Sequence, residues 1–195
     1  LFKNTTADNN TAVGNSALVN ATTGTQNVAI GAGASDALTT GSHNIVVGGD
    51  SLSADTLGSR NVAVGYACLN NQTFTSATTV YNVAIGFNAG FAVTTGINNT
   101  LIGGLCGDAL TDADSNTAIG TNALATDRLG SRSIAIGQGA LFSQNFGTAA
   151  NTLNTAVGYE AGVLLNGGIN CTFIGGSAGD NVTSGTQNTL IGAQV

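Results

Sequence analysis

The chain has 195 residues, of which 42% are hydrophobic and only 7% are charged, and it contains 29 Gly but no Pro, Met or Trp. Disordered chains combine low hydrophobicity with high charge or proline, so this composition indicates a folded protein. A formal net charge of -6 with only four Lys and Arg residues argues against nucleic acid as a partner, because phosphate binding needs a stripe of cations.

A pentad of the type Asn-Val-Ala-Ile-Gly, best seen at residues 27–31, returns eleven times and organises the whole sequence. Self-similarity at a fixed short period is the signature of a repeat architecture, in which each unit buries its apolar face against its neighbours. In chain order the pentads are residues 10–14, 27–31, 44–48, 61–65, 82–86, 99–103, 116–120, 133–137, 154–158, 171–175 and 188–192.

The spacing between pentads is itself periodic. Three spacings of 17 residues alternate with one of 21, which gives a larger repeat of 72 residues. We therefore expect residues 1–195 to form a single repeat array, with super-repeats at approximately 14–85 and 86–157 and partial ones at 1–13 and 158–195. The chain starts at Leu1 and carries no distinctive capping sequence, so we expect a segment of a longer protein or a unit whose ends are covered.

The residue before each pentad glycine is always Val or Ile, and the residue two positions earlier is always Thr, Val or Ile. Alternate β-branched residues favour a short strand with one face packed inward, so we expect an all-β parallel β-solenoid of about eleven coils of 17 or 21 residues. Helical coils are disfavoured because no 3.6-residue period is present. The expected structural ladder is Val13, Ile30, Val47, Val64, Ile85, Ile102, Ile119, Ile136, Val157, Ile174 and Ile191.

We expect this ladder to face the interior, so that aspartate in place of Ile102 or Ile119 breaks the array. The residue between the two β-branched positions is usually Ala, but four coils have a larger apolar residue there: Val46, Leu101, Phe173 or Leu190. The opposite face is therefore also at least partly apolar. A sheet that is apolar on both sides needs two coverings, and a partner chain is a natural second one.

The rest of each coil connects one pentad to the next. Segments such as residues 16–18, 122–124 and 139–141 predict a second short strand, and the Gly, Ser and Thr that follow predict tight corners. The Asn that opens most pentads predicts an amide ladder from coil to coil. The four extra residues of each long coil fall within 70–81 and 142–153, which we expect to bulge from the shaft.

The pentads with the Ala-Leu that follows them, at residues 10–18 and 116–124, resemble the head repeats of YadA-like trimeric autotransporter adhesins and similar repeats of phage tail fibres. The resemblance spans nearly the whole chain. It implies a parallel β-roll, three chains packed side by side and an adhesive or spacing shaft. The coils here are longer than those of the adhesin heads, which makes the chain more similar to a tail-fibre shaft.

Residues that could carry chemistry are few. His43, the only histidine, occupies a turn position that other coils fill with Asn, Gln, Ser or Arg. Equivalent aspartates four coils apart lie roughly 19 Å from each other and cannot share a metal ion. Further candidates are surface turn residues at Asp36, Asp108 and Asp180, a weak calcium signal at Asp112 and Asp114, turn-spanning pairs of Asp55 with Arg60 and Asp127 with Arg132, and small buried fillers at Cys68, Cys106 and Cys171, which are too far apart to form disulfides.

The sequence therefore predicts a non-enzymatic structural protein with no cofactor and no metal, and without a membrane span in this segment. The first hypothesis is a tail-fibre shaft, extracellular or on the virion surface, whose partners are identical chains in a homotrimer and a glycan or protein of the host surface. The alternatives are a bacterial trimeric adhesin head on the cell surface and the subunit of a filament that stacks head to tail. Rows of Thr also raise an ice-binding alternative, although a regular Thr-x-Thr pattern is not sustained on one face.

Overall fold

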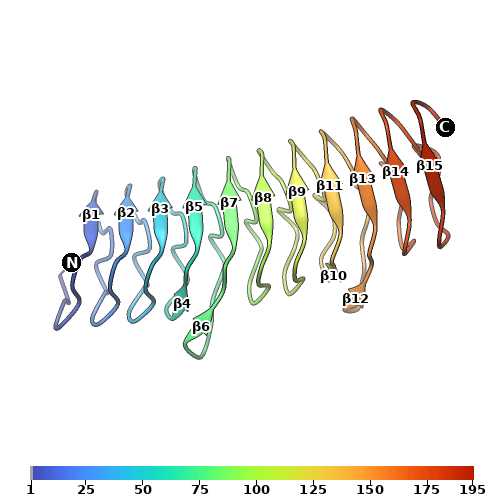
Figure 1. Cartoon of the computed structure of the whole chain (residues 1–195). Helices are drawn as coiled ribbons and strands as arrows, with labels where there is room; N and C mark the ends of the chain where they lie inside the picture. The colour runs from blue at the N-terminus through green and yellow to red at the C-terminus, as the bar shows by residue number, and fades with distance from the viewer. Residues whose placement is uncertain (1) are drawn as a thin grey trace.

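A computed structural model describes residues 2–195 and shows an all-β parallel solenoid of eleven turns laid side by side (Figure 1). Each turn contributes one three-residue strand to a single sheet. The strands of this sheet, in order across it, are β1 (Thr11–Val13), β2 (Val28–Ile30), β3 (Ile45–Val47), β5 (Val62–Val64), β7 (Val83–Ile85), β8 (Thr100–Ile102), β9 (Thr117–Ile119), β11 (Ile134–Ile136), β13 (Thr155–Val157), β14 (Thr172–Ile174) and β15 (Thr189–Ile191).

Every strand pairs in parallel with the strands of the preceding and following turns, and equivalent pentad positions always lie opposite each other. Thr11 pairs with Val28 and Val13 with Ile30, and the same register continues to the end of the sheet. Backbone bonds close each step, as from Thr11 N–H to the Asn27 carbonyl oxygen at 2.8 Å. Because parallel strands lie about 4.8 Å apart, eleven of them make a row roughly 50 Å long.

The two long coils form the protrusions that the sequence predicts. Two small parallel sheets lie at their bases, one of β4 (Gly58–Ser59) with β6 (Thr78–Thr79) and one of β10 (Gly130–Ser131) with β12 (Ala150–Asn151). In Figure 1 the loop at β6 extends clearly beyond the turns of its 17-residue neighbours. The four extra residues are therefore accommodated outside the shaft.

The prediction that the Val and Ile ladder faces the interior is wrong. Val13 is 57% exposed and Ile191 68%, and the other members are exposed or half-buried. The middle residue of the strand points inward instead, and from β2 to β14 it is fully buried in every case. Side chains alternate across a strand, so the two β-branched residues of each pentad both lie on the outer face of the sheet. Only the middle residue of each strand points into the interior.

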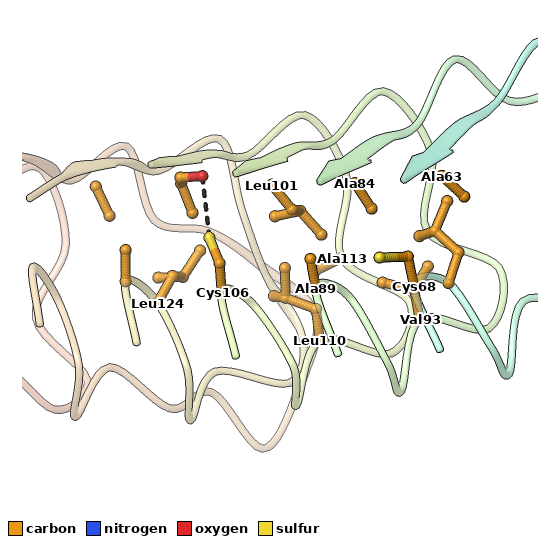
Figure 2. Close-up of a cluster of buried hydrophobic side chains, with 14 of the residues drawn as sticks. Ala63, Cys68, Ala84, Ala89, Val93, Leu101, Cys106, Leu110, Ala113 and Leu124 are labelled. Carbon is orange, nitrogen blue, oxygen red and sulfur yellow. Dashed lines mark hydrogen bonds between the residues drawn. The ribbon is translucent and has the colours of Figure 1, made fainter. Parts of the chain in front are cut away.

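The interior is narrow, and large and small side chains compensate across it. Most strands present Ala inward, and the opposite wall then supplies a fully buried leucine such as Leu110 or Leu124 (Figure 2). Where the strand supplies Leu101, the opposite wall carries glycine: a Cβ at Gly90 or Gly107 would lie 2.7 or 2.8 Å from the leucine methyl groups. Phe173 lies 72 residues after Leu101, and it too is faced by glycines in the turn before it and in the turn after it. Such complementarity gives the dense packing of a protein core.

The second strand predicted after each glycine does not form in the described part of the chain, residues 2–195. Residues 16–18, 122–124 and 139–141 form turns, and Leu18, Leu124 and Leu141 have φ values of 48°, 54° and 51°. A residue with a φ near 50° is in the left-handed region of backbone conformation, so a β-strand cannot continue through it and the chain changes direction. The leucines nevertheless lie inside, as do the alanines that precede them.

Candidate functional site

Asparagine side chains run through the shaft as a buried spine. The Asn27 Oδ1 atom accepts the backbone N–H of Asn44 at 2.9 Å and the Asn44 side chain at 3.1 Å, while the Asn27 Nδ2 atom donates to the Gly41 carbonyl oxygen at 2.9 Å. The same pattern connects Asn10 through Asn61, which confirms the predicted amide ladder. Each side chain therefore satisfies a carbonyl oxygen and an N–H at the equivalent corner of the following turn.

The spine is interrupted at each long coil, where a second polar network replaces one link. Asn82 donates its side-chain amide to Gln72 Oε1 at 2.9 Å, and Gln72 donates to Asp55 Oδ2 at 2.7 Å. The Oδ1 atom of Asn61 is left without a hydrogen-bond partner. An equivalent chain joins Asn154, Gln144 and Asp127 in the second long coil.

These networks hold the bases of the two protrusions. The Asp55 carboxylate also accepts the backbone N–H of Gly58, which lies in β4, at 3.0 Å. Asp127 does the same for Gly130 in β10 at 3.1 Å. The position seven residues after the pentad glycine is apolar in the other turns, for instance Leu110. The two aspartates and two glutamines therefore occupy places that core side chains fill elsewhere, and there they hold the loops by hydrogen bonds.

The predicted pairing of Asp55 with Arg60, and of Asp127 with Arg132, is wrong. Both aspartates are fully buried and their carboxylates are bonded to amides, whereas both arginines are exposed. Arg60 instead donates to the hydroxyl of Thr79 and lies 5.8 Å from the centre of the Tyr81 ring. In each pair the aspartate side chain points into the interior of the solenoid, and the arginine side chain, five residues later, points to the solvent.

Removal of one spine amide is expected to destabilise the fold. In Asn99→Ala the backbone N–H of Asn116 loses its acceptor, at 2.9 Å, and the Ala113 carbonyl loses its donor, at 2.8 Å. Each buried polar group left unpaired costs about 1–3 kcal/mol, so we expect a loss of roughly 2–5 kcal/mol in urea unfolding. Asn71→Ala, at an exposed asparagine, is the control and should change the free energy by less than about 0.5 kcal/mol.

Asp55 is expected to make stability depend on pH. Burial raises the pKa of Asp55 above its ordinary value, and the bonds from Gln72 and the backbone only partly oppose this shift. The folded state therefore holds the proton more tightly than the unfolded state, so the contribution of Asp55 is fully present below about pH 4 and falls as the pH rises through the raised pKa.

The measurement is urea unfolding of the native chain and of Asp55→Asn at a series of pH values between about 4 and 7. The advantage of the native chain over the variant should shrink as the pH rises. An advantage that grows toward neutral pH would contradict the assigned protonation. The comparison is needed because burial also raises the pKa of Asp36 and Asp108, which are present in both proteins.

The three cysteines are buried and free, as the sequence predicts. The Cys106 thiol donates to the Ala118 carbonyl oxygen at 3.0 Å, the bond drawn in Figure 2, and burial raises its pKa to about 12. The Cys68 thiol lies 2.7 Å from the Gly86 carbonyl oxygen, and burial raises its pKa too. Such thiols are unreactive and serve as small core residues.

The other residues singled out from the sequence do not assemble into a reactive centre. His43 is exposed in a turn with φ 63°, and Asp36, Asp108 and Asp180 lie half-buried at equivalent turns. Within residues 2–195 no group of three or more His, Cys, Asp or Glu side chains is placed to hold a metal ion. Residues 2–195 also contain no helix of the length and apolar character that a bilayer crossing requires.

Asp112 and Asp114 line a shallow hollow of about 370 Å³ beside the second protrusion, together with Ser131 and Asn151. Their carboxylates already accept hydrogen bonds within the shaft, Asp112 from the Thr95 hydroxyl and Asp114 from the Ile97 N–H at 2.8 Å. The two acids therefore act as links between turns.

Comparison with protein-family models, with curated proteins and with solved structures found no match to this chain.

Proposed function

We propose that the chain is a non-enzymatic structural segment, the shaft of a phage tail fibre that spaces or mediates attachment to a host surface. The observation that carries the proposal is the continuity of the shaft: one sheet of eleven parallel strands runs through all its turns without a break. The buried spine and the two acid-amide networks use their polar groups to join turns and to anchor loops. Nearly all of the repeated residues serve to stack one turn on the next, and a rod built in this way is suited to act as a spacer.

The two protrusions are the parts of the shaft that would reach a host glycan or protein. They project from the shaft at β6 and β12, and their bases are fixed by buried hydrogen bonds, so they present loops at defined positions. Binding loops on a rigid scaffold are a common arrangement in proteins. The proposed location is extracellular, on the virion surface.

The test is electron microscopy with gold-labelled antibodies raised against this chain, applied to particles and cells from a culture that expresses the gene. Gold on fibres that project from phage tails is the expected result. Label on bacterial surfaces without phage would identify an adhesin instead, and label on free filaments of uniform width would identify a filament subunit. Label confined to the interior of cells would refute a surface role altogether.

A further inference from the structure

The residue before each pentad lies exposed at a corner of the shaft, and in successive turns these residues form a row. Their φ values fall between 53° and 65° in all eleven turns, so the backbone of this corner is the same throughout. The Arg60 N–H bonds to the Ser42 carbonyl oxygen at 3.0 Å, which stacks one corner on the previous one. Consecutive side chains are therefore presented to solvent roughly 4.8 Å apart. We define the corner row as residues 9, 26, 43, 60, 81, 98, 115, 132, 153, 170 and 187.

The third to sixth turns of the corner row hold His43, Arg60, Tyr81 and Asn98. The Arg60 guanidinium donates to the Thr79 hydroxyl at 3.1 Å and lies 5.8 Å from the centre of the Tyr81 ring, which is 54% exposed. These contacts orient the guanidinium at the base of the first protrusion, between β4 and β6. A guanidinium has five N–H groups, so this single hydrogen bond leaves the others for a ligand.

The charge around Arg60 favours an anion. Outside the core, the carboxylates of this corner belong to Asp8 in the first turn and to Asp112 and Asp114 in the seventh. Arg60 is in the fourth turn, so three turns, or roughly 14 Å, separate it from each of them along the shaft. Exposed charges more than about 8–10 Å apart are largely screened at physiological salt. The corner is thus locally cationic, although the chain has a net charge of -6.

The equivalent corner of the second protrusion has a different character. Arg132 lies 72 residues after Arg60, and its N–H bonds to the Asp114 carbonyl oxygen at 3.0 Å, which places an aspartate in the adjacent turn. Leu153 stands where the first protrusion has Tyr81. The nearby carboxylate opposes the binding of anions, and leucine offers no ring. Of the two protrusions, the first therefore presents the better site for an anion.

We propose that His43, Arg60, Tyr81 and Asn98 bind an acidic polysaccharide, one that carries carboxylate or sulfate groups. Guanidinium groups bind such anions through parallel N–H bonds. The Tyr81 ring offers a flat apolar surface for one face of a sugar and a hydroxyl at its tip, and the His43 and Asn98 side chains can bond to sugar hydroxyls. An exposed row suits a polymer that lies along the shaft, whereas small ligands are enclosed in pockets. Peptides are bound through side-chain pockets or as an added strand, which favours a polysaccharide here.

This inference rests on the proposed function, because it names the kind of host glycan that the first protrusion binds. The test is calorimetric titration of the 195-residue chain with dextran sulfate, polygalacturonate and neutral dextran. The native chain should bind both acidic polymers and not the neutral one. Arg60→Gln should weaken this binding roughly tenfold or more, and Tyr81→Leu, which copies the second protrusion, roughly 2–5-fold.

The matched control is Arg132→Gln, which removes the same charge from the equivalent corner and should bind as the native chain does. Circular dichroism shows whether each variant is folded. If Arg60→Gln is unfolded, Arg60→Lys takes its place, and it should also weaken binding because lysine lacks the guanidinium fork.

Equal losses in Arg60→Gln and Arg132→Gln would show attraction by overall charge only and would overturn the proposal, as would a native chain that binds neither acidic polymer. Inorganic sulfate that binds as tightly as dextran sulfate would assign the site to a free anion, and polyglutamate that binds as tightly would assign it to acidic peptides; either result overturns the polysaccharide. Tail fibres that carry the chain without binding acidic polysaccharide refute this inference alone. Binding that depends on Arg60, by a chain found away from virions, refutes only the proposed function.

Discussion

Aspartate in place of Ala118 is expected to prevent the array from folding, whereas aspartate in place of the next residue, Ile119, should leave it folded. Ala118 is the middle residue of β9 and is fully buried, with Cys106 bonded to its carbonyl oxygen. A carboxylate placed there has no partner, and burial of an unpaired charge costs more than the 5–15 kcal/mol by which a typical protein is stable. Ile119 lies half-buried on the outer face, where the carboxylate stays in water.

The measurement is urea unfolding followed by circular dichroism, at a protein concentration where light scattering gives one chain mass. This condition matters because Ile119 lies on the outer face of the sheet, where any association between chains would add to the apparent stability of the native protein. We expect a loss of roughly 1–2 kcal/mol for Ile119→Asp and no cooperative transition for Ala118→Asp. Equal losses, or a greater loss for Ile119→Asp, would mean that the two faces have been exchanged.

The sequence predicts the stacking of the turns because the pentads repeat in strict register. Parallel pairing, the number of turns and the amide ladder from Asn10 to Asn61 all follow from that period. The two protrusions follow from the four extra residues of each long coil. These features depend on the order of residues along one strand and on chain length, both of which a single sequence displays.

The direction of the two faces could not be predicted from hydrophobicity, because the inner row is mostly alanine and the outer row is more apolar. A narrow interior reverses the usual rule: alanine is inside since the opposite wall brings a leucine to meet it. The signal that could have shown this is the coupling of Leu101 to Gly90 and Gly107, where a large inner residue is matched by the loss of a side chain across the core.

The burial of Asp55 could likewise not be predicted from its residue type. Charged residues are rarely fully buried, so an aspartate five residues from an arginine suggests a surface pair. Comparison of equivalent turns gives the better prediction, since Leu38 and Leu110 occupy the position of Asp55 in other coils. Gln72 occupies it in the next turn, directly where the carboxylate needs a donor.

The second large effect is expected at the pentad glycines, where substitution by alanine should disrupt the backbone contact between consecutive turns and destabilise the protein. Gly103 has a φ of 137°, which is essentially restricted to glycine, and a Cβ there would lie 2.6 Å from the carbonyl carbon and oxygen of Gly120 in the following turn. That neighbour is backbone, and it is held in turn by the next coil, so it cannot move aside. Strain and overpacking together should cost roughly 2–6 kcal/mol in urea unfolding.

Gly104 provides the matched control, one residue further along the chain. A Cβ at Gly104 meets nothing within 4 Å, and its φ lies outside the positive range. Gly104→Ala should therefore be neutral or stabilise the protein by about 0.4–1 kcal/mol, because alanine restricts the unfolded chain. A Gly103→Ala variant as stable as Gly104→Ala would show that consecutive turns are not in backbone contact at the pentad glycine. If the difference is observed, the invariant glycine of the pentad is explained by the approach of one turn to the next, and the spacing of the shaft is set by backbone contact as much as by side-chain packing.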